Sequence, residues 1–498
     1  MLSGGRPRAT APRRLVSAAA VVVLATVIGL ELHDLPRLPV GAWLVAGPAL
    51  LVLGFALLQG PRWCLAVLIV VDIFGLYKVG RSIGPVNLRL IDIPYVALVA
   101  SVLVQRAREG PLPRPRLGQR AIGLWLIAVG VSLYPLAVHA PGSATSAVVE
   151  WLRLVQTLSL VWLVPYALRK LHDLEAVLGV IALAIALEIG GSSLNVLVHG
   201  GVNARFRLSG GVGANTSGLL AALLVLMSFH SPVPRRRWLR VAMLVVGVTG
   251  LVLAKSLGGI AAAGVALAVF GFRGPAVGRS RRAGMLMPTR LLLVALAAVA
   301  LGVSVKGENF PGSPRFGGSS TMQRTMLATA GLELFADHPL TGVGWHSAPS
   351  PAEARHINDR LKRLFGKDVN PQFYPEVTMP NYIAVHNTYV QIPAETGLLG
   401  FGLFIVAAFA AARGIRTVLS NARARPEVYA SAHCVLVLLV ATLVWFNDNT
   451  LFGAQPETVL AATFFGMLSA VPLLLQSAAG ASGPEMGNRP PASTELGR

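Results

Sequence analysis

The stretch VHNTYVQIPAETGLLGFGLF, residues 385–404, runs without a break from a polar segment carrying a histidine into a hydrophobic segment that can enter a bilayer. In a regular helix Gly397 lies about 20° from His386 around the axis, and Gly400 lies about 40° to the other side. The histidine is therefore expected above a stripe of glycines on which another backbone can pack closely. Pro393 is expected to kink the helix just below the histidine. Two interpretations of His386 are open on this stretch alone: a cap on a transmembrane helix, or a titratable catalytic group at the membrane–water boundary.

The composition of the whole chain is that of a polytopic membrane protein. Of its 498 residues 54% are hydrophobic and only 13% are charged, whereas a soluble protein has about 25% charged residues. The net charge of +21 comes from arginines gathered in short loops between apolar runs. That pattern sets membrane topology and contacts anionic headgroups, so a nucleic-acid partner is not expected. Cys64 and Cys434 both lie in apolar runs, which supports neither a disulfide framework nor a thiolate metal site.

The apolar runs predict an all-α fold, a bundle of about 12 to 14 transmembrane helices. The first run follows four arginines but lacks a small-residue cleavage site, so it is expected to be an uncleaved span. The runs lie near residues 15–30, 42–58, 63–77, 91–104, 121–138, 147–167, 176–195, 216–230, 239–254, 257–272, 291–305, 388–411, 430–446 and 456–476.

Three regions are expected along the chain. Residues 1–195 form N-terminal transmembrane helices, and residues 196–476 form a second membrane region that includes one large loop, 306–385. Residues 477–498 are rich in Pro, Gly and Ser and are expected to be a disordered tail.

Alternate loops differ in charge, which predicts their side of the membrane. Arginines concentrate in 105–120, 234–240, 273–290 and 412–425. These loops and both termini are therefore expected in the cytoplasm, and the loop 306–385 is expected outside the cytoplasmic membrane.

The large loop is expected to contain structure of its own. The sequence Ser-Pro-Ala-Glu at 350–353 is a capping box and predicts a helix over 351–365 that ends at Gly366. Its apolar stripe, which includes Ile357 and Leu361, is suited to lying on the outer leaflet or covering a cavity. A second helix is expected over 321–336, followed by a turn at 337–345.

Several charged residues outside the cytoplasmic loops are candidate ligand contacts. Arg205 and Arg207 precede the glycines at 210, 211 and 213, where the backbone can approach a ligand, and an arginine there suits a phosphate. Arg324 lies in the helix expected over 321–336. For each arginine a headgroup contact or surface ion pair is the alternative. The loop histidines His338, His346 and His356 are too far apart in sequence for a helical metal pair, so no metal site is expected.

These residues resemble a known family. His386-Asn387 followed after nine residues by Gly-Leu-Leu-Gly is similar to the hallmark of the O-antigen ligase and polymerase superfamily. Two further stretches resemble its pattern: Arg207-Leu-Ser-Gly, and Arg324 followed by the His-Pro-Leu-x-Gly-Val-Gly turn at 338–344. The resemblance covers roughly residues 200–410, and the ligases of the family usually have about twelve spans.

The resemblance implies transfer of an oligo- or polysaccharide from a polyprenyl diphosphate carrier to a sugar hydroxyl at the outer face of the cytoplasmic membrane. The acceptor is a glycolipid, lipid A–core, for a ligase, and another repeat unit for a polymerase. His386 would be the general base, and Arg207 and Arg324, with Arg205 and Asn387 beside them, would contact the substrate. A histidine suits proton abstraction near neutral pH, and arginines can hold a diphosphate without a metal or other cofactor. The rival interpretation is a transporter or flippase of a glycolipid or another anionic substrate, which would place charged residues near mid-membrane.

Overall fold

The structure is a computed structural model, and it describes residues 54, 56, 59–76, 80–83, 86–110, 118–134, 141–200, 208, 211–271, 320–347, 351–366, 385–449, 451 and 455–481. The spans expected at 15–30 and 291–305, most of the one at 42–58, and the tail from 482 lie outside these residues. Arg205 and Arg207 lie outside them as well.

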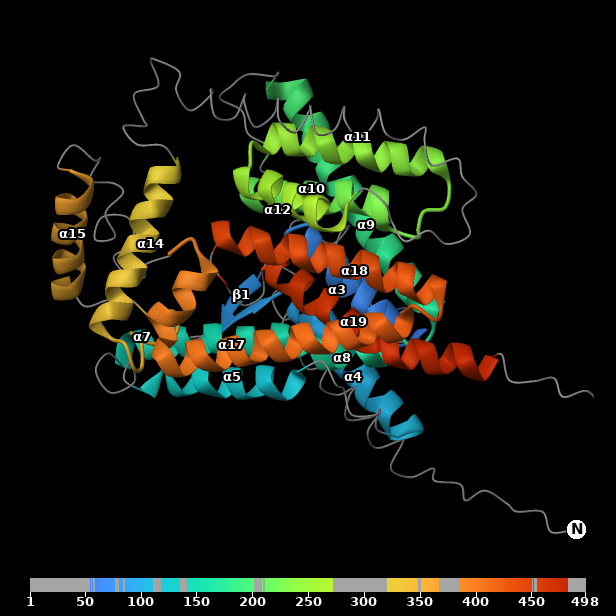
Figure 1. Cartoon of the computed structure of the whole chain (residues 1–498), viewed down its shortest axis with the longest axis horizontal. Helices are drawn as coiled ribbons and strands as arrows, with labels where there is room; N and C mark the ends of the chain where they lie inside the picture. The colour runs from blue at the N-terminus through green and yellow to red at the C-terminus, as the bar shows by residue number, and fades with distance from the viewer. Residues whose placement is uncertain are drawn as a thin grey trace, which may run out of the picture.

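Wherever the structure describes an expected span, it has a helix, which confirms the all-α class (Figure 1). The helices are α3 (Pro61–Ile73), α4 (Asp92–Glu109), α5 (Gln119–Val131), α7 (Pro141–Leu158), α8 (Leu160–Ala167), α9 (Leu171–Asn195), α10 (Ala214–His230), α11 (Arg237–Ala254), α12 (Leu257–Phe270), α14 (Ser320–Asp337), α15 (Pro351–Phe365), α17 (Thr388–Ala422), α18 (Pro426–Trp445) and α19 (Pro456–Ala481). The only strands in the described ranges form one short antiparallel hairpin, β1 (Gly80–Ile83) with β2 (Val86–Arg89), at a loop for which no structure was expected.

Six of the described helices are long and apolar enough to cross a membrane, so the chain is a multi-pass membrane protein. They cover Ala144–Ala167, Leu171–Val198, Arg237–Ala254, Thr388–Ala422, Pro426–Trp445 and Pro456–Ser477. The apolar helices α5, α10 and α12 are shorter.

Helix α10 is the centre of the bundle. Its residues Leu219–Met227 are all buried, as expected for a helix that is hydrophobic on every side. It packs against α11, α12 and α18. A side chain on Gly259 of α12 would lie 2.5 Å from the carbonyl oxygen of Gly218, so small residues allow α10 and α12 to approach backbone to backbone.

Contacts between helix ends sort the loops into two groups. At one end ion pairs join Arg62 to Asp173 and Arg169 to Glu109. At the other end Gly211 N donates to the Glu188 side chain at 2.8 Å. The arginine-rich loops next to α4, α11 and α18 lie at the same end as these ion pairs. This agrees with the alternation of charge between successive loops that the sequence predicts. Which group faces the cytoplasm stays a prediction.

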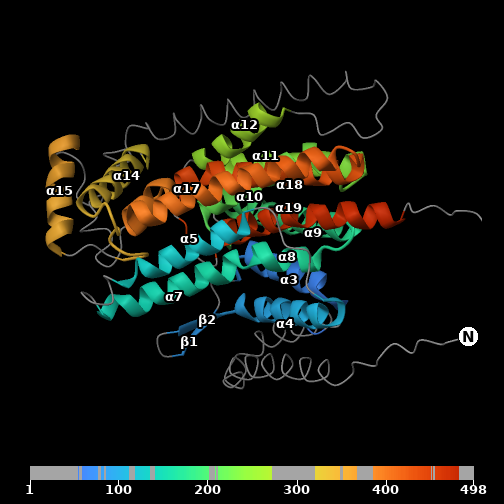
Figure 2. The ribbon, with the colours of Figure 1, turned by 60° about the horizontal axis from the view of Figure 1, so that its bottom comes forward.

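Helices α14 and α15 form a small lobe at the second end of the bundle, as Figures 1 and 2 show. The helix expected over 351–365 is confirmed at those bounds, and Gly366 follows it with φ 89°. Arg360 of α15 pairs with Glu333 and lies 3.8 Å from Asp337 of α14. Ile357 and Leu361 are fully buried in a core shared with α14. For Ile357 and Leu361 the expectation that this apolar stripe faces lipid or covers a cavity is therefore wrong, because α14 packs against them.

Candidate active site

Helix α17 is broken at Gly397. This residue has φ 61° and ψ −166°, so two helical segments meet there, while Pro393 lies inside the first segment. The expected kink at Pro393 is thus replaced by a break four residues later. The expected continuous stripe is also wrong, because His386 precedes the helix, which begins at Thr388.

The turn at 338–347 fills this break. Val343 N donates to the Ala394 carbonyl at 3.0 Å, and Gly344 N donates to the Glu395 carbonyl at 2.9 Å. In the other direction, Leu398 N donates to the Pro339 carbonyl at 2.7 Å. The turn therefore supplies the hydrogen bonds that the interrupted helix cannot make within itself.

The glycines of the two segments permit this contact. A Cβ on Gly342 would lie 2.3 Å from the Glu395 carbonyl carbon, and a Cβ on Gly397 would lie 2.4 Å from the Leu340 carbonyl. The expectation that another backbone packs against the glycines of this helix is confirmed at Gly397, where that backbone belongs to the turn, whereas Gly400 lies against the Thr396 side chain. The buried carboxylate of Glu395 adds a contact by accepting from His346 N at 2.9 Å.

His386 is held at the entrance to α17 by its two neighbours. Val385 is buried in the core of the α14–α15 lobe. Asn387 caps the helix, because its side-chain oxygen accepts from the N–H groups of Tyr389 and Val390. His386 itself has φ 49°, an uncommon conformation that a side chain adopts only when its surroundings impose it. The ring is half-buried as a result.

Arg324 lies close enough to act on this histidine. Gly331, seven residues further along α14 and so on the same face, would place a Cβ 2.9 Å from the side chains of Val385 and Val390. Burial lowers the pKa of His386 below its usual value of 6.5, and the positive charge of Arg324 lowers this pKa further. The lowered pKa favours the neutral imidazole, the form that can accept a proton.

A chain of polar contacts joins the start of α17 to the starts of α10 and α19. The Thr388 hydroxyl donates to the Asn449 carbonyl at 2.9 Å. The Asn449 side chain donates to the Glu457 carboxylate at 3.2 Å, and the Thr216 hydroxyl donates to the same carboxylate at 3.4 Å. Thr216 follows the segment that carries Arg205 and Arg207. The network therefore connects the residues just after that segment to the start of α17, next to His386.

Sequence reasoning missed the residues between α18 and α19. Asn387 Nδ2 donates to Asn447 Oδ1 at 3.0 Å, and Gln391 exchanges two hydrogen bonds with the backbone of Leu451 at 3.2 and 2.8 Å. The polar run Asn-Asp-Asn at 447–449, between two apolar runs, was the available signal.

The other loop histidines have separate environments. The His338 ring lies 2.6 Å from the Glu353 carboxylate and joins the turn to α15. Burial lowers the pKa of His346 to about 4. In the part of the chain that the structure describes, no three His, Cys, Asp or Glu side chains gather as metal ligands do.

Comparison with known proteins gives a match to one family. No curated protein matches the chain. The matching family model covers α11, α12, the α14–α15 lobe and the beginning of α17, and thus contains both Arg324 and His386. Residues 242–405 of this membrane protein match the family model described as O-antigen ligase.

Proposed function

We propose that this protein is a membrane glycan ligase or polymerase. It transfers an oligo- or polysaccharide from a polyprenyl diphosphate carrier to a hydroxyl of a glycan or glycolipid acceptor, at the outer face of the cytoplasmic membrane. The observation that carries the proposal is the half-buried His386 beside the charge of Arg324, within a region that matches the O-antigen ligase family model.

The reaction needs a base at the acceptor and positive charge at the leaving group. The acceptor hydroxyl attacks the anomeric carbon of the donor, and His386 accepts the hydroxyl proton. The bond from the anomeric carbon to the diphosphate oxygen breaks, and its electron pair leaves with the polyprenyl diphosphate. Arg324 stabilises the charge that develops there, since a guanidinium forms two parallel hydrogen bonds to phosphate oxygens.

Arg207 is proposed as the second diphosphate contact, with Arg205 next to it. Support comes from the contacts on either side of their loop, because Leu208 N donates to the Leu253 carbonyl at 2.9 Å and Thr216 bonds to Glu457. Two arginines are able to neutralise a diphosphate, so the transfer is proposed to be independent of metal ions.

The location of these groups favours a transferase over a transporter. A transporter binds its substrate near mid-membrane on discontinuous helices. His386 lies before the first turn of α17, and Arg324 lies in a lobe at the end of the bundle. A donor whose lipid tail stays in the bilayer presents its diphosphate at that depth. Both termini are proposed to lie in the cytoplasm.

The test is transfer by purified protein with a polyprenyl-diphosphate-linked glycan and its acceptor. His386→Ala should lower the rate by about two to four orders of magnitude, the range for loss of a general base. The matched control is His356→Ala, which removes an exposed histidine from α15. Near-normal transfer by the His386 variant would leave this residue with only a capping role.

The arginine roles are tested separately. Arg324→Lys and Arg207→Lys should both transfer poorly, because an ammonium cannot reproduce the planar two-pronged contact. Arg205→Ala should have a smaller effect. If the lysine variants kept full activity, a simple point charge would be sufficient and the bidentate contact would be excluded.

A further inference from the structure

A polar pocket lies at the end of the bundle opposite the candidate active site. It has a volume of about 840 Å³ and is formed where the start of α3, the end of α4, the junction of α8 with α9 and the end of α19 meet. This size is within the usual range for a small-molecule site, about 300–1,000 Å³. None of its lining belongs to the network around His386.

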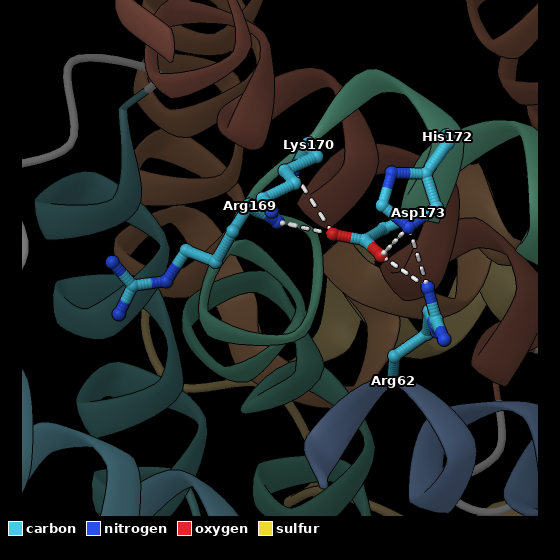
Figure 3. Close-up of polar contacts among 5 residues, drawn as sticks. All are labelled: Arg62, Arg169, Lys170, His172 and Asp173. Atoms are coloured by element: carbon cyan, nitrogen blue, oxygen red, sulfur yellow. Dashed lines mark hydrogen bonds and ion pairs between the residues drawn. The ribbon is translucent and has the colours of Figure 1, made fainter. Parts of the chain in front are cut away.

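Cations line the pocket, and their neighbours hold them in fixed orientations. Arg62 Nη1 lies 2.5 Å from Asp173 Oδ1, and its guanidinium lies 5.3 Å from the ring centre of Trp63. Arg169 lies 3.0 Å from Glu109 and 5.6 Å from the ring centre of Tyr166. Figure 3 shows Arg62 reaching Asp173 while Arg169 extends the other way. The pocket thus has guanidinium groups on two walls.

The carboxylates of the pocket are already neutralised. Asp173 Oδ2 accepts from the backbone N–H groups of Lys170 at 2.9 Å and Arg169 at 3.3 Å, while Oδ1 contacts Arg62 and lies 3.1 Å from the His172 ring (Figure 3). Glu109 is paired with Arg169. Lys170 is exposed and adds a third cation to the lining. The two carboxylates are paired with the two arginines, so Lys170 is the excess cation of the lining, and an anion is the ligand that complements it.

The depth of the pocket indicates where that anion comes from. Trp63 and Tyr166 lie beside its arginines, and aromatic residues of this kind mark the headgroup level of a bilayer. The wall contributed by α19 consists of Leu473, Gln476 and Ser477, so Leu473 offers an apolar contact to the first acyl carbons and the two polar residues suit the glycerol of a lipid. Basic pockets between helix ends at this level bind the headgroups of anionic lipids.

We propose that this pocket binds the phosphodiester headgroup of an anionic phospholipid. The headgroup phosphate accepts hydrogen bonds from Arg169 and Lys170, Arg62 stays on Asp173 and adds its charge to the lining, and the acyl chains run along the end of α19. The bound lipid would link the ends of α3, α4, α9 and α19. This binding is independent of the transfer reaction, so its test does not depend on the proposed activity.

The experiment measures lipid retention on the purified full-length protein by native mass spectrometry, with phosphatidylglycerol and phosphatidylcholine of the same acyl chains. The double variant Arg169→Gln/Lys170→Gln leaves the Arg62–Asp173 pair intact. It should lower retention of phosphatidylglycerol by about tenfold or more, because two charge-assisted contacts are lost. The control Arg106→Gln/Arg108→Gln removes the same charge from the same end of the bundle, outside the pocket lining, and should retain the lipid.

A second arm separates a lipid from a soluble anion. Excess glycerol 3-phosphate or inorganic phosphate should not displace the bound phosphatidylglycerol, since neither has acyl chains to place along α19. Displacement by either would assign the pocket to a soluble phosphate ligand and overturn the proposal. Equal retention by the two double variants, or equal retention of phosphatidylcholine, would also overturn it.

Discussion

Replacing Gly397 by alanine should separate the turn at 338–347 from the broken helix α17. Gly397 has φ 61° and ψ −166°, a region that only glycine populates freely, and forcing another residue into it costs about 1–3 kcal/mol. The new Cβ would lie 2.4 Å from the Leu340 carbonyl and 2.6 Å from Gly342 N. These are backbone atoms that cannot rotate away, so overpacking adds about 1–3 kcal/mol. The sum is about 2–6 kcal/mol.

This cost is comparable to the stabilisation that the turn gains from docking. The turn is attached to α17 by three backbone hydrogen bonds, each with a net contribution of about 0.5–1.5 kcal/mol. We therefore expect Gly397→Ala to insert into the membrane and keep its bundle, but to undock the turn and displace the lobe that holds Arg324 near His386. Transfer should fall by at least tenfold, because a displaced catalytic geometry is enough for such a loss.

The assay combines transfer rate with limited proteolysis of the turn in membranes. The matched control is Gly402→Ala, on the same helix, where a Cβ meets no atom within 4 Å. The control should keep both its transfer rate and its resistance to protease. If Gly397→Ala matched the control in both measurements, the turn would not hold the site together and the reasoning would be refuted.

The pKa of His386 gives a prediction for pH dependence. Since this pKa lies below 6.5, kcat/KM should decrease only as the pH falls below that value. Arg324→Gln removes the positive charge that lowers the pKa, so the acidic limb of the profile should move to higher pH; an unchanged limb would contradict the coupling. Transfer should persist in excess EDTA, and a loss that magnesium restores would count against charge neutralisation by arginine. An impermeant thiol reagent on intact cells should label a cysteine placed at Ser319 but not one at Ser482; the reverse pattern would invert the topology.

Much of the bundle could be predicted because each span depends on local composition. A run of apolar residues long enough to cross the bilayer has few alternatives to a helix, since backbone groups must be satisfied within the segment. Helix α15 was also predictable at both ends, because a proline at its first position and Gly366 after its last are local signals.

The site could be predicted only in part, because its geometry depends on contacts between distant segments. The pattern around His386 identified the histidine, but no local signal distinguished a kink at Pro393 from a break at Gly397. That choice is made by Val343 and Gly344, about fifty residues earlier, whose N–H groups donate to the opened helix, while Gly342 leaves room for the contact. The contact of Asn387 with Asn447, sixty residues away, depends in the same way on how α18 packs against α17.

The docking of the turn against α17 also limits which of its backbone N–H groups can bind a ligand. A glycine-rich turn often serves as a nest of free N–H groups that encloses a phosphate. Here every amide from 342 to 347 already donates within the protein: to His338, Ala394 and Glu395 carbonyls, to the Ser132 hydroxyl, to the Glu395 carboxylate, and to the Gly344 carbonyl. Between 342 and 347 the main chain has no donor left for an oxyanion. The proposed anion recognition beside His386 therefore depends on side chains, and replacing one arginine there should alter it without any change in the backbone.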